Sequence, residues 1–145
     1  MSPDTIFQLC STIAMIGWLL LIIASPFLQG IDKFLVSVVI TLFCIVYAWL
    51  IFQVFSPADM KNFGSLDGVM TLFQNRTLVT AGWVHYLAFD LMTGVWIKGN
   101  SLKYGISHWI LIPCLFFTFM LGPLGLLLYV LIRTLKAKQY FAENF

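Results

Sequence analysis

One apolar stretch, residues 78–97, constrains this chain more than any other feature of its sequence. The stretch is long enough to cross a lipid bilayer as a single helix, yet it contains His85 and Asp90. A charged side chain such as aspartate costs about 2.5–3.5 kcal/mol at the centre of a membrane helix on insertion scales. We therefore expect both residues to serve either chemistry or helix packing.

Composition supports a membrane location. Of the 145 residues, 61% are hydrophobic and 10% are charged, whereas soluble domains are about one-quarter charged. This balance excludes a water-soluble globular domain and predicts a single integral membrane domain that covers residues 1–145. The net charge of +2 comes from a few basic residues near the ends of the apolar runs and indicates no nucleic-acid partner.

Hydropathy and helix-breaking residues predict an all-α fold, a bundle of four transmembrane helices. The expected spans are residues 6–28, 34–55, 78–97 and 107–133. The first two spans are joined by a short link, so they are expected to be antiparallel neighbours. Pro123 follows Gly122 inside the fourth span and is expected to kink that helix, because proline removes a helical hydrogen bond.

The loop at residues 56–77 is the only long segment outside the predicted spans. In this loop, apolar residues such as Leu66, Val69 and Met70 are interspersed with polar residues. This pattern is typical of a short amphipathic helix on the membrane surface. An ordered loop that folds its apolar side chains back into the bundle would explain it equally well.

Four spans would place both termini on one side of the membrane. Five lysines and arginines would lie on that side: Lys61, Arg76, Arg133, Lys136 and Lys138. Three would lie on the other: Lys33, Lys98 and Lys103. The excess favours cytoplasmic termini in a multi-pass protein of the plasma (inner) membrane.

His85 and Asp90 lie on different sides of the third predicted helix. At 100° per residue, Trp83 and Tyr86 share a face with Asp90, while His85 and Phe89 fall on the opposite side. The two ionisable residues are separated by about 140° around the axis and about 7.5 Å along it, so they cannot pair within the helix. Each needs partners on another helix, in a bound ligand or in trapped water.

Two interpretations of these residues remain open. Asp90 without a cationic partner is expected to be uncharged, because burying a charge is costly, and it could then donate a proton to a ligand. His85 could donate or accept a proton. Alternatively, both residues belong to polar networks that only fix how the helices pack.

The sequence predicts neither a metal site nor a cofactor. His108 lies near one membrane edge, roughly 18 Å in depth from His85 at 1.5 Å per residue, which does not suit a haem held by both histidines. The three cysteines are scattered, and the chain has no metal-binding spacing of His or Cys. His108 and Trp109 are instead expected to mark the membrane interface, where amphipathic rings collect.

The segment Gly82-Trp83-Val84-His85-Tyr86-Leu87-Ala88-Phe89-Asp90-Leu91 resembles the third span of the abscisic-acid-deficient-four-like membrane family. Three further segments extend the likeness: Leu66-Asp67-Gly68-Val69-Met70, His108-Trp109-Ile110-Leu111-Ile112-Pro113-Cys114 and Gly122-Pro123-Leu124-Gly125-Leu126-Leu127. Plant members are associated with neoxanthin formation, in which a carotenoid epoxide rearranges to an allene. The chain looks like the bacterial members.

The resemblance implies a membrane fold and a carotenoid or other isoprenoid ligand, with isomerase-type activity as one hypothesis. Opening an epoxide needs an acid at the oxygen and a base at a neighbouring carbon, and in principle no cofactor. Asp90 and His85 are the candidates, with Tyr86 as an auxiliary donor. Five aromatic residues are candidate ligand contacts: Trp83, Phe89 and Trp96, which would line an apolar slot, and His108 and Trp109.

The second hypothesis is a non-catalytic accessory subunit of a larger membrane complex, one that could bear pigment. Aromatic residues make up 17% of the chain and fall on several predicted helix faces. The expected partners are therefore membrane lipid, an isoprenoid and further membrane proteins. A proton-coupled carrier fits less well, because such carriers use paired broken helices and only the fourth helix is broken.

Overall fold

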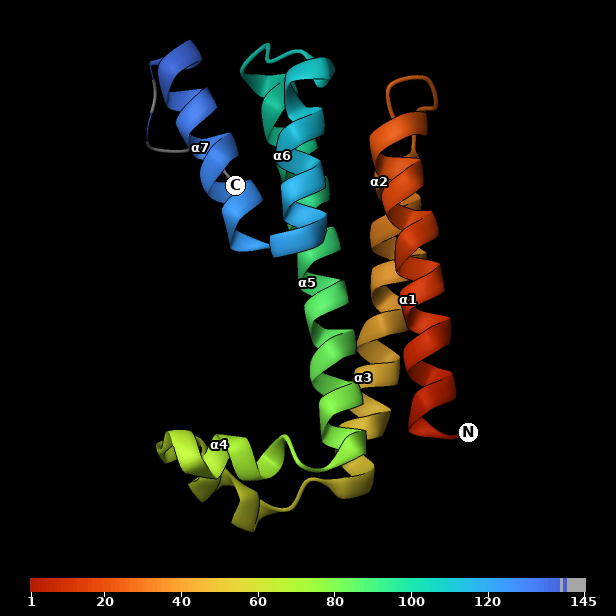
Figure 1. The fold of residues 1–145 in the computed structure, drawn as a ribbon. Coiled ribbons are helices and arrows are strands. Elements are labelled where there is room, and N and C mark those ends of the chain that lie inside the picture. Colours follow the sequence, from red (N-terminus) through yellow and green to blue (C-terminus); the bar gives the residue numbers. More distant parts are fainter. Residues whose placement is uncertain (139, 141–145) are drawn as a thin grey trace.

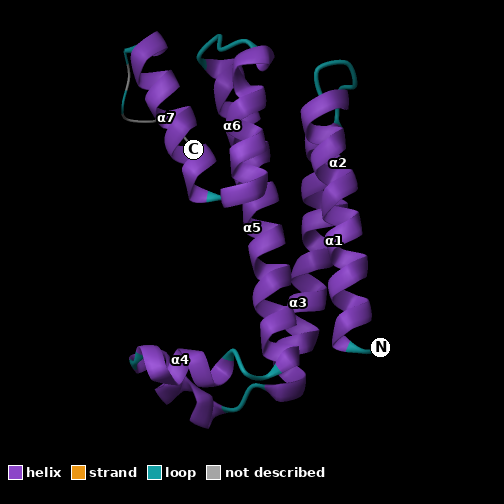
Figure 2. Ribbon diagram, viewed as in Figure 1, coloured by secondary structure: helices purple, strands orange, loops and turns teal. Residues whose placement is uncertain are grey.

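All regular elements are helices in the computed structural model, which describes residues 1–138 and 140 (Figures 1 and 2). In chain order they are α1 (Pro3–Leu19), η1 (Leu20–Ala24), α2 (Ile31–Phe34), η2 (Leu35–Ile40), α3 (Thr41–Val54), η3 (Pro57–Gly64), α4 (Leu66–Leu72), α5 (Arg76–Lys103), α6 (His108–Leu121) and α7 (Pro123–Ala137). The turns η1 and η2 are π-helical, and η3 is a 3₁₀ helix.

The first half of the chain forms the predicted antiparallel pair. Ser2 caps α1 by accepting the amide hydrogen of Thr5, and Gly30 adopts a φ of 89° where the chain turns. The segments Pro3–Ala24 and Ile31–Val54 are each long and apolar enough to cross a membrane. Their bounds agree to within a few residues with the predicted spans, except at the end of the first.

The helix α5 is the centre of the fold. Asn75 caps it by accepting the amide hydrogens of Thr77 and Leu78. Its 28 residues give a length of about 42 Å, and its lower half runs beside α1 and α3 (Figure 1). The predicted third span therefore exists as a helix, although it is not one of the two segments that meet the spanning criterion.

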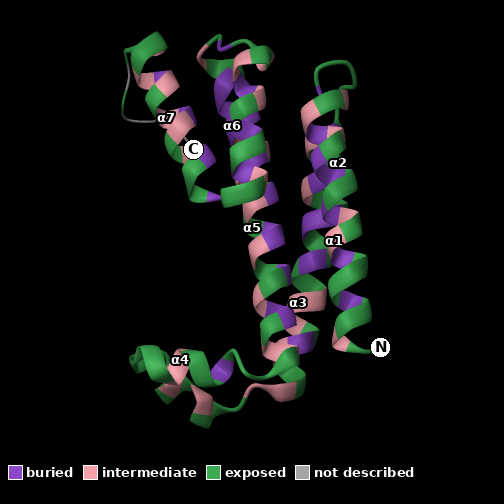
Figure 3. Ribbon diagram, in the orientation of Figure 1, coloured by how far each residue is buried: buried purple, intermediate pink, exposed green. Residues whose placement is uncertain are grey.

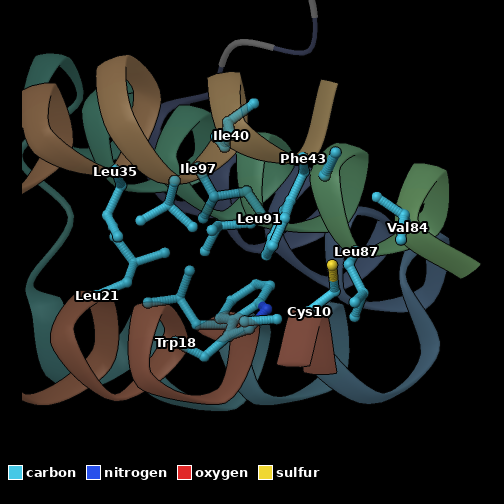
Figure 4. Close-up of a cluster of buried hydrophobic side chains, with 14 of the residues drawn as sticks. Cys10, Trp18, Leu21, Leu35, Ile40, Phe43, Val84, Leu87, Leu91 and Ile97 are labelled. Atoms are coloured by element: carbon cyan, nitrogen blue, oxygen red, sulfur yellow. The ribbon is translucent and has the colours of Figure 1, made fainter. Parts of the chain in front are cut away.

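The hydrophobic core begins where α1, α3 and α5 meet and continues into α6 and α7, where Leu111, Leu115 and Tyr129 are also buried (Figure 3). Trp18 is only 2% exposed, and its side chain lies near Leu91 among the aliphatic residues that Figure 4 labels. The close approach needs Gly94, because a β-carbon there would lie 2.6 Å from Cη2 of Trp18. A glycine in α5 thus makes room for the largest side chain of α1.

The expectation of a continuous, kinked fourth helix over residues 107–133 is wrong. The chain reverses at Gly122, and α6 and α7 form an antiparallel hairpin (Figure 1). Gly122 has φ 47° and ψ −97°, a conformation that L side chains rarely adopt. Gly125 lets the two helices touch, because a β-carbon there would overlap the backbone nitrogen of Thr118.

The hairpin changes the layout of the molecule. The 14 residues of α6 give about 21 Å, which is shorter than the roughly 30 Å hydrocarbon core of a bilayer. The C-terminal end of α7 lies at the same end of the molecule as the turn that follows η1, and the N-terminus lies at the other end (Figure 1). The end of α7 therefore lies away from the end of the molecule where α1 begins, and the C-terminal tail, which the four-span layout places on the side of the N-terminus, lies largely outside the described residues.

Residues 57–73, here called the cap segment, lie across the N-terminal end of α5 (Figure 1). Ser56 and Asp59 form a reciprocal capping box at the start of η3, and Ser65 caps α4 by accepting the amide hydrogen of Gly68. Leu72 is buried while Leu66 is exposed. The segment thus contains the predicted short helix and also returns apolar side chains to the bundle.

Candidate functional site

The carboxyl group of Asp90 lies midway along α5, against the turn of the α6–α7 hairpin. A β-carbon at Gly122 would lie 2.7 Å from Oδ1 and 3.1 Å from Oδ2 of Asp90. Oδ2 is buried and has no hydrogen-bond partner among the described residues. Burying an unpaired polar atom is unfavourable, so this oxygen is a candidate to meet a proton, a water molecule or a ligand.

Tyr86 joins Asp90 in the same polar group. It lies one helical turn earlier on α5, and its hydroxyl interacts with the Asp90 carboxyl. The same hydroxyl donates a long hydrogen bond of 3.4 Å to the backbone carbonyl of Met120. One hydroxyl thus faces both the Asp90 carboxyl and the end of α6.

His85 is separate from this group. Its ring packs against Tyr47, with centroids 5.5 Å apart, and against Phe89, at 4.5 Å. His85 is exposed and forms no hydrogen bond with the described residues. The structure does not bring His85 and Asp90 together, in agreement with their angular separation on the helix.

The aromatic side chains proposed to line one slot face different neighbours. Trp83 donates from Nε1 to Oγ of Ser11 at 2.9 Å and so links α5 to α1. Trp96 meets the ring of Tyr129 on α7 edge-on at 5.8 Å. Phe89 is 61% exposed. Of the three, only Phe89 and Trp83 lie within two turns of Tyr86, and Trp96 belongs to the packing of the hairpin.

His108 forms a hydrogen bond with the backbone, which the sequence pattern did not indicate. Its Nε2 lies 2.8 Å from the carbonyl oxygen of Ile22. That carbonyl lacks a helical partner because the residue four positions on is Pro26, which has no amide hydrogen, and the amide of Phe27 bonds Ala24 instead. His108 therefore donates through Nε2 and replaces the missing amide, whereas its neighbour Trp109 is 77% exposed.

Two further polar groups escaped sequence reasoning. Lys98 is largely buried and its Nζ lies 2.7 and 2.8 Å from the two carboxylate oxygens of Asp32. Asn100 accepts from the Tyr129 hydroxyl at 2.6 Å and from Nη1 of Arg133 at 3.0 Å. Both groups join α5 to residues far away in the sequence, so their partners could not be found from local patterns. The only local sign of these contacts was the presence of Lys98 and Asn100 near the end of an apolar helix.

A cavity of about 200 Å³ lies between the cap segment and the facing ends of α3 and α5. Its lining is mostly apolar and consists of Tyr47, Ile51, Phe55, Phe63, Val69, Leu72, Phe73, Leu78 and Gly82. No group of three metal-ligating side chains occurs within the residues that the structure describes. The chemistry available near Asp90 is thus that of a carboxyl group and a phenol.

A family model for ABA DEFICIENT 4-like proteins matches residues 5–129. The chain belongs to this family. Searches of curated proteins and of solved structures each found no match. The family match runs from α1 into α7 and includes Tyr86, Asp90 and Gly122, whereas Arg133 lies beyond it. Both the residues at the hairpin turn and the cap segment therefore fall within the part of the chain that the ABA DEFICIENT 4-like family shares.

Proposed function

We propose that this chain is an integral membrane protein that binds a carotenoid or other isoprenoid along α5 and isomerises it by acid–base chemistry at Asp90. The observation that carries the proposal is the buried, unpartnered Oδ2 of Asp90 beside Tyr86 and the hairpin turn. Family membership supports an isoprenoid ligand, because plant relatives are associated with carotenoid epoxide rearrangement.

The distribution of apolar surface supports the membrane part of the proposal. Only 33% and 22% of the residues are buried in the most apolar windows of Pro3–Ala24 and Ile31–Val54. Large side chains such as Ile45 and Phe52 are exposed on α3. Soluble proteins rarely expose extended apolar surface of this kind, so lipid is the natural solvent for these helices, with α5 as a third full-length pass.

The chemistry needs one acid and one base. Asp90 in its neutral form would donate its proton to an epoxide oxygen, the carbon–oxygen bond would break, and a base would remove a proton from the neighbouring carbon. One proton is added and one is lost, so the product is an isomer of the substrate. Tyr86 would hold the oxygen in place, and either the resulting Asp90 carboxylate or His85 would take the proton from carbon.

A structural role for the same residues supports the second candidate, a non-catalytic subunit. A helix end inside a membrane leaves carbonyl groups without hydrogen-bond partners. The Tyr86 hydroxyl supplies a hydrogen bond to one of these carbonyl groups, that of Met120. In that case Asp90 and Tyr86 serve only to seat the hairpin. The chain would then work through other membrane proteins.

The decisive experiment begins with gentle purification in lipid nanodiscs, followed by mass spectrometry of bound pigment, lipid and protein. The same preparation is then incubated with a carotenoid epoxide, and products of unchanged mass are separated by chromatography. We expect a bound isoprenoid, and we expect Asp90→Asn to slow isomer formation by about 100-fold or more. The matched control is Asp67→Asn, because Asp67 is an exposed carboxylate on α4.

Unchanged isomer formation in Asp90→Asn would remove Asp90 from the mechanism. Absence of both an isoprenoid and an isomer, together with stable co-purification of other membrane proteins, would favour the subunit candidate. Tyr86→Phe separates the two roles further, because loss of a positioning hydroxyl should reduce turnover while the protein keeps its thermal stability.

A further inference from the structure

The cavity beneath the cap segment has the size and lining of a binding site for one ring. Its volume is about 200 Å³, and an apolar protein cavity of about 150 Å³ is large enough for benzene. Four of its lining residues are aromatic: Tyr47, Phe55, Phe63 and Phe73. Flat aromatic walls suit a compact unsaturated or methyl-substituted ring.

The cavity and the polar group at Asp90 lie along one side of α5. Gly82 lines the cavity, and Tyr86 and Asp90 follow at intervals of four residues, each turned about 40° further around the helix. The eight residues from Gly82 to Asp90 span about 12 Å. An extended molecule with one end in the cavity would therefore place a group about 12 Å away beside Asp90.

Two polar side chains lie beside the line along α5 that joins the cavity to Asp90. Tyr47 lines the cavity, its ring lies 5.5 Å from that of His85, and neither side chain has a hydrogen bond to the described residues. The exposed ring of Phe89 lies between His85 and Asp90 around the helix. A ligand that leaves the cavity along α5 thus passes over Phe89, between the two ionisable residues.

We propose that this cavity anchors a ring at the apolar end of the ligand and thereby determines which atoms reach Asp90. The ligand class is a membrane-soluble molecule in which an extended chain joins a compact ring to a hydroxyl or epoxide oxygen about 12 Å away. This inference rests on the proposed function, and it adds a second binding subsite and a length requirement to it.

The test uses two probes of equal carbon number in nanodiscs. All-trans-retinol carries a methyl-substituted ring joined by an extended chain to a hydroxyl, and geranylgeraniol is an acyclic isoprenoid alcohol. Bound probe is quantified by mass spectrometry after size-exclusion chromatography. We expect retinol to bind more tightly than geranylgeraniol.

Two variants fill the cavity from opposite walls. Val69→Phe acts from α4, and Gly82→Leu acts from α5, where the first added carbon fits at 3.5 Å from Phe73. Each should weaken retinol binding about tenfold or more, because a ring is left unburied. The matched control is Met70→Phe, which adds a ring to the exposed neighbour of Val69 on α4 and should leave retinol affinity unchanged.

The outcomes distinguish failure of the ring anchor from failure of the proposed function. Retinol binding that survives both filling variants, or equal binding of the two alcohols, overturns the ring anchor and leaves isoprenoid binding at Asp90 intact. If wild-type protein binds neither probe, the proposed function fails and the anchor fails with it. Asp90→Asn should retain the ring in the cavity, so loss of turnover with retained retinol binding supports both proposals.

Discussion

The carboxyl group of Asp90 occupies the space where Gly122 would carry a side chain. A β-carbon built on Gly122 would lie 2.7 Å from Oδ1 of Asp90, and the φ of Gly122 is 47°. One glycine thus permits both the reversal of the chain and the contact between the hairpin turn and α5.

Gly122→Ala tests this contact. The strained backbone should cost about 1–3 kcal/mol, and the collision with Asp90 should add to it. Chemical unfolding in detergent micelles measures the loss. In a double-mutant cycle, Asp90→Ala should recover the collision part of the loss, because the space then becomes free. Simple additivity of the two substitutions would show that Asp90 does not press against the turn.

Gly94→Ala should disturb the core contact with Trp18. The added carbon would lie 2.6 Å from Trp18 Cη2 and 2.9 Å from Leu21 Cδ2, and overpacking of this kind costs about 1–3 kcal/mol. The control is Gly99→Ala in the same helix, where no atom lies within 4 Å of the added carbon and where alanine should be neutral or stabilising. Equal effects at both glycines would contradict the packing described for Trp18.

Lys98→Met should destabilise the protein by about 1–3 kcal/mol, because it leaves the partly buried Asp32 carboxylate without its cation. Thermal unfolding in nanodiscs measures the change. Lys33, the exposed residue next to Asp32, provides the control, since Lys33→Met removes the same charge without breaking the ion pair between Lys98 and Asp32. Adding Asp32→Asn to Lys98→Met should restore part of the stability, and a further loss would show that the pair is not coupled.

His108→Phe should be more harmful while residue 26 is proline than when residue 26 carries an amide hydrogen. The substitution removes the donor to the Ile22 carbonyl, at a cost of about 1–3 kcal/mol for an unsatisfied buried group. Pro26→Ala restores an amide hydrogen four residues after Ile22, so His108→Phe should cost less in that background. The coupling is measured by unfolding the four proteins of the cycle. Equal costs with and without Pro26 would mean that His108 acts in another way.

Local sequence patterns predicted the first two helices, because long apolar runs and a glycine turn are sufficient to define them. Sequence also placed Asp90 and His85 on different sides of α5. It missed the reversal at Gly122, since a run of apolar residues from 107 to 133 is equally consistent with one kinked span and with a hairpin. A local signal of the reversal was Gly122 directly before Pro123, because glycine permits a positive φ and proline is favoured in the first turn of a helix.

The remaining contacts of the site join residues that are far apart in the chain. The bond between His108 and Ile22 spans 86 positions, and the one between Lys98 and Asp32 spans 66. Neither hydropathy nor helical periodicity contains information on such pairs. The cap segment is an intermediate case, because its short helix was predictable but the cavity beneath it depends on where α3 ends and α5 begins.

The hairpin of α6 and α7 also affects how the protein meets its surroundings. If α1, the α2–α3 segment and α5 are full-length passes, as proposed, the chain would cross the bilayer an odd number of times, and the hairpin would enter and leave on one face. Met1 and Ala137 would then belong to different compartments. An enzyme or partner that acts on the beginning of this chain would therefore not meet the end of α7.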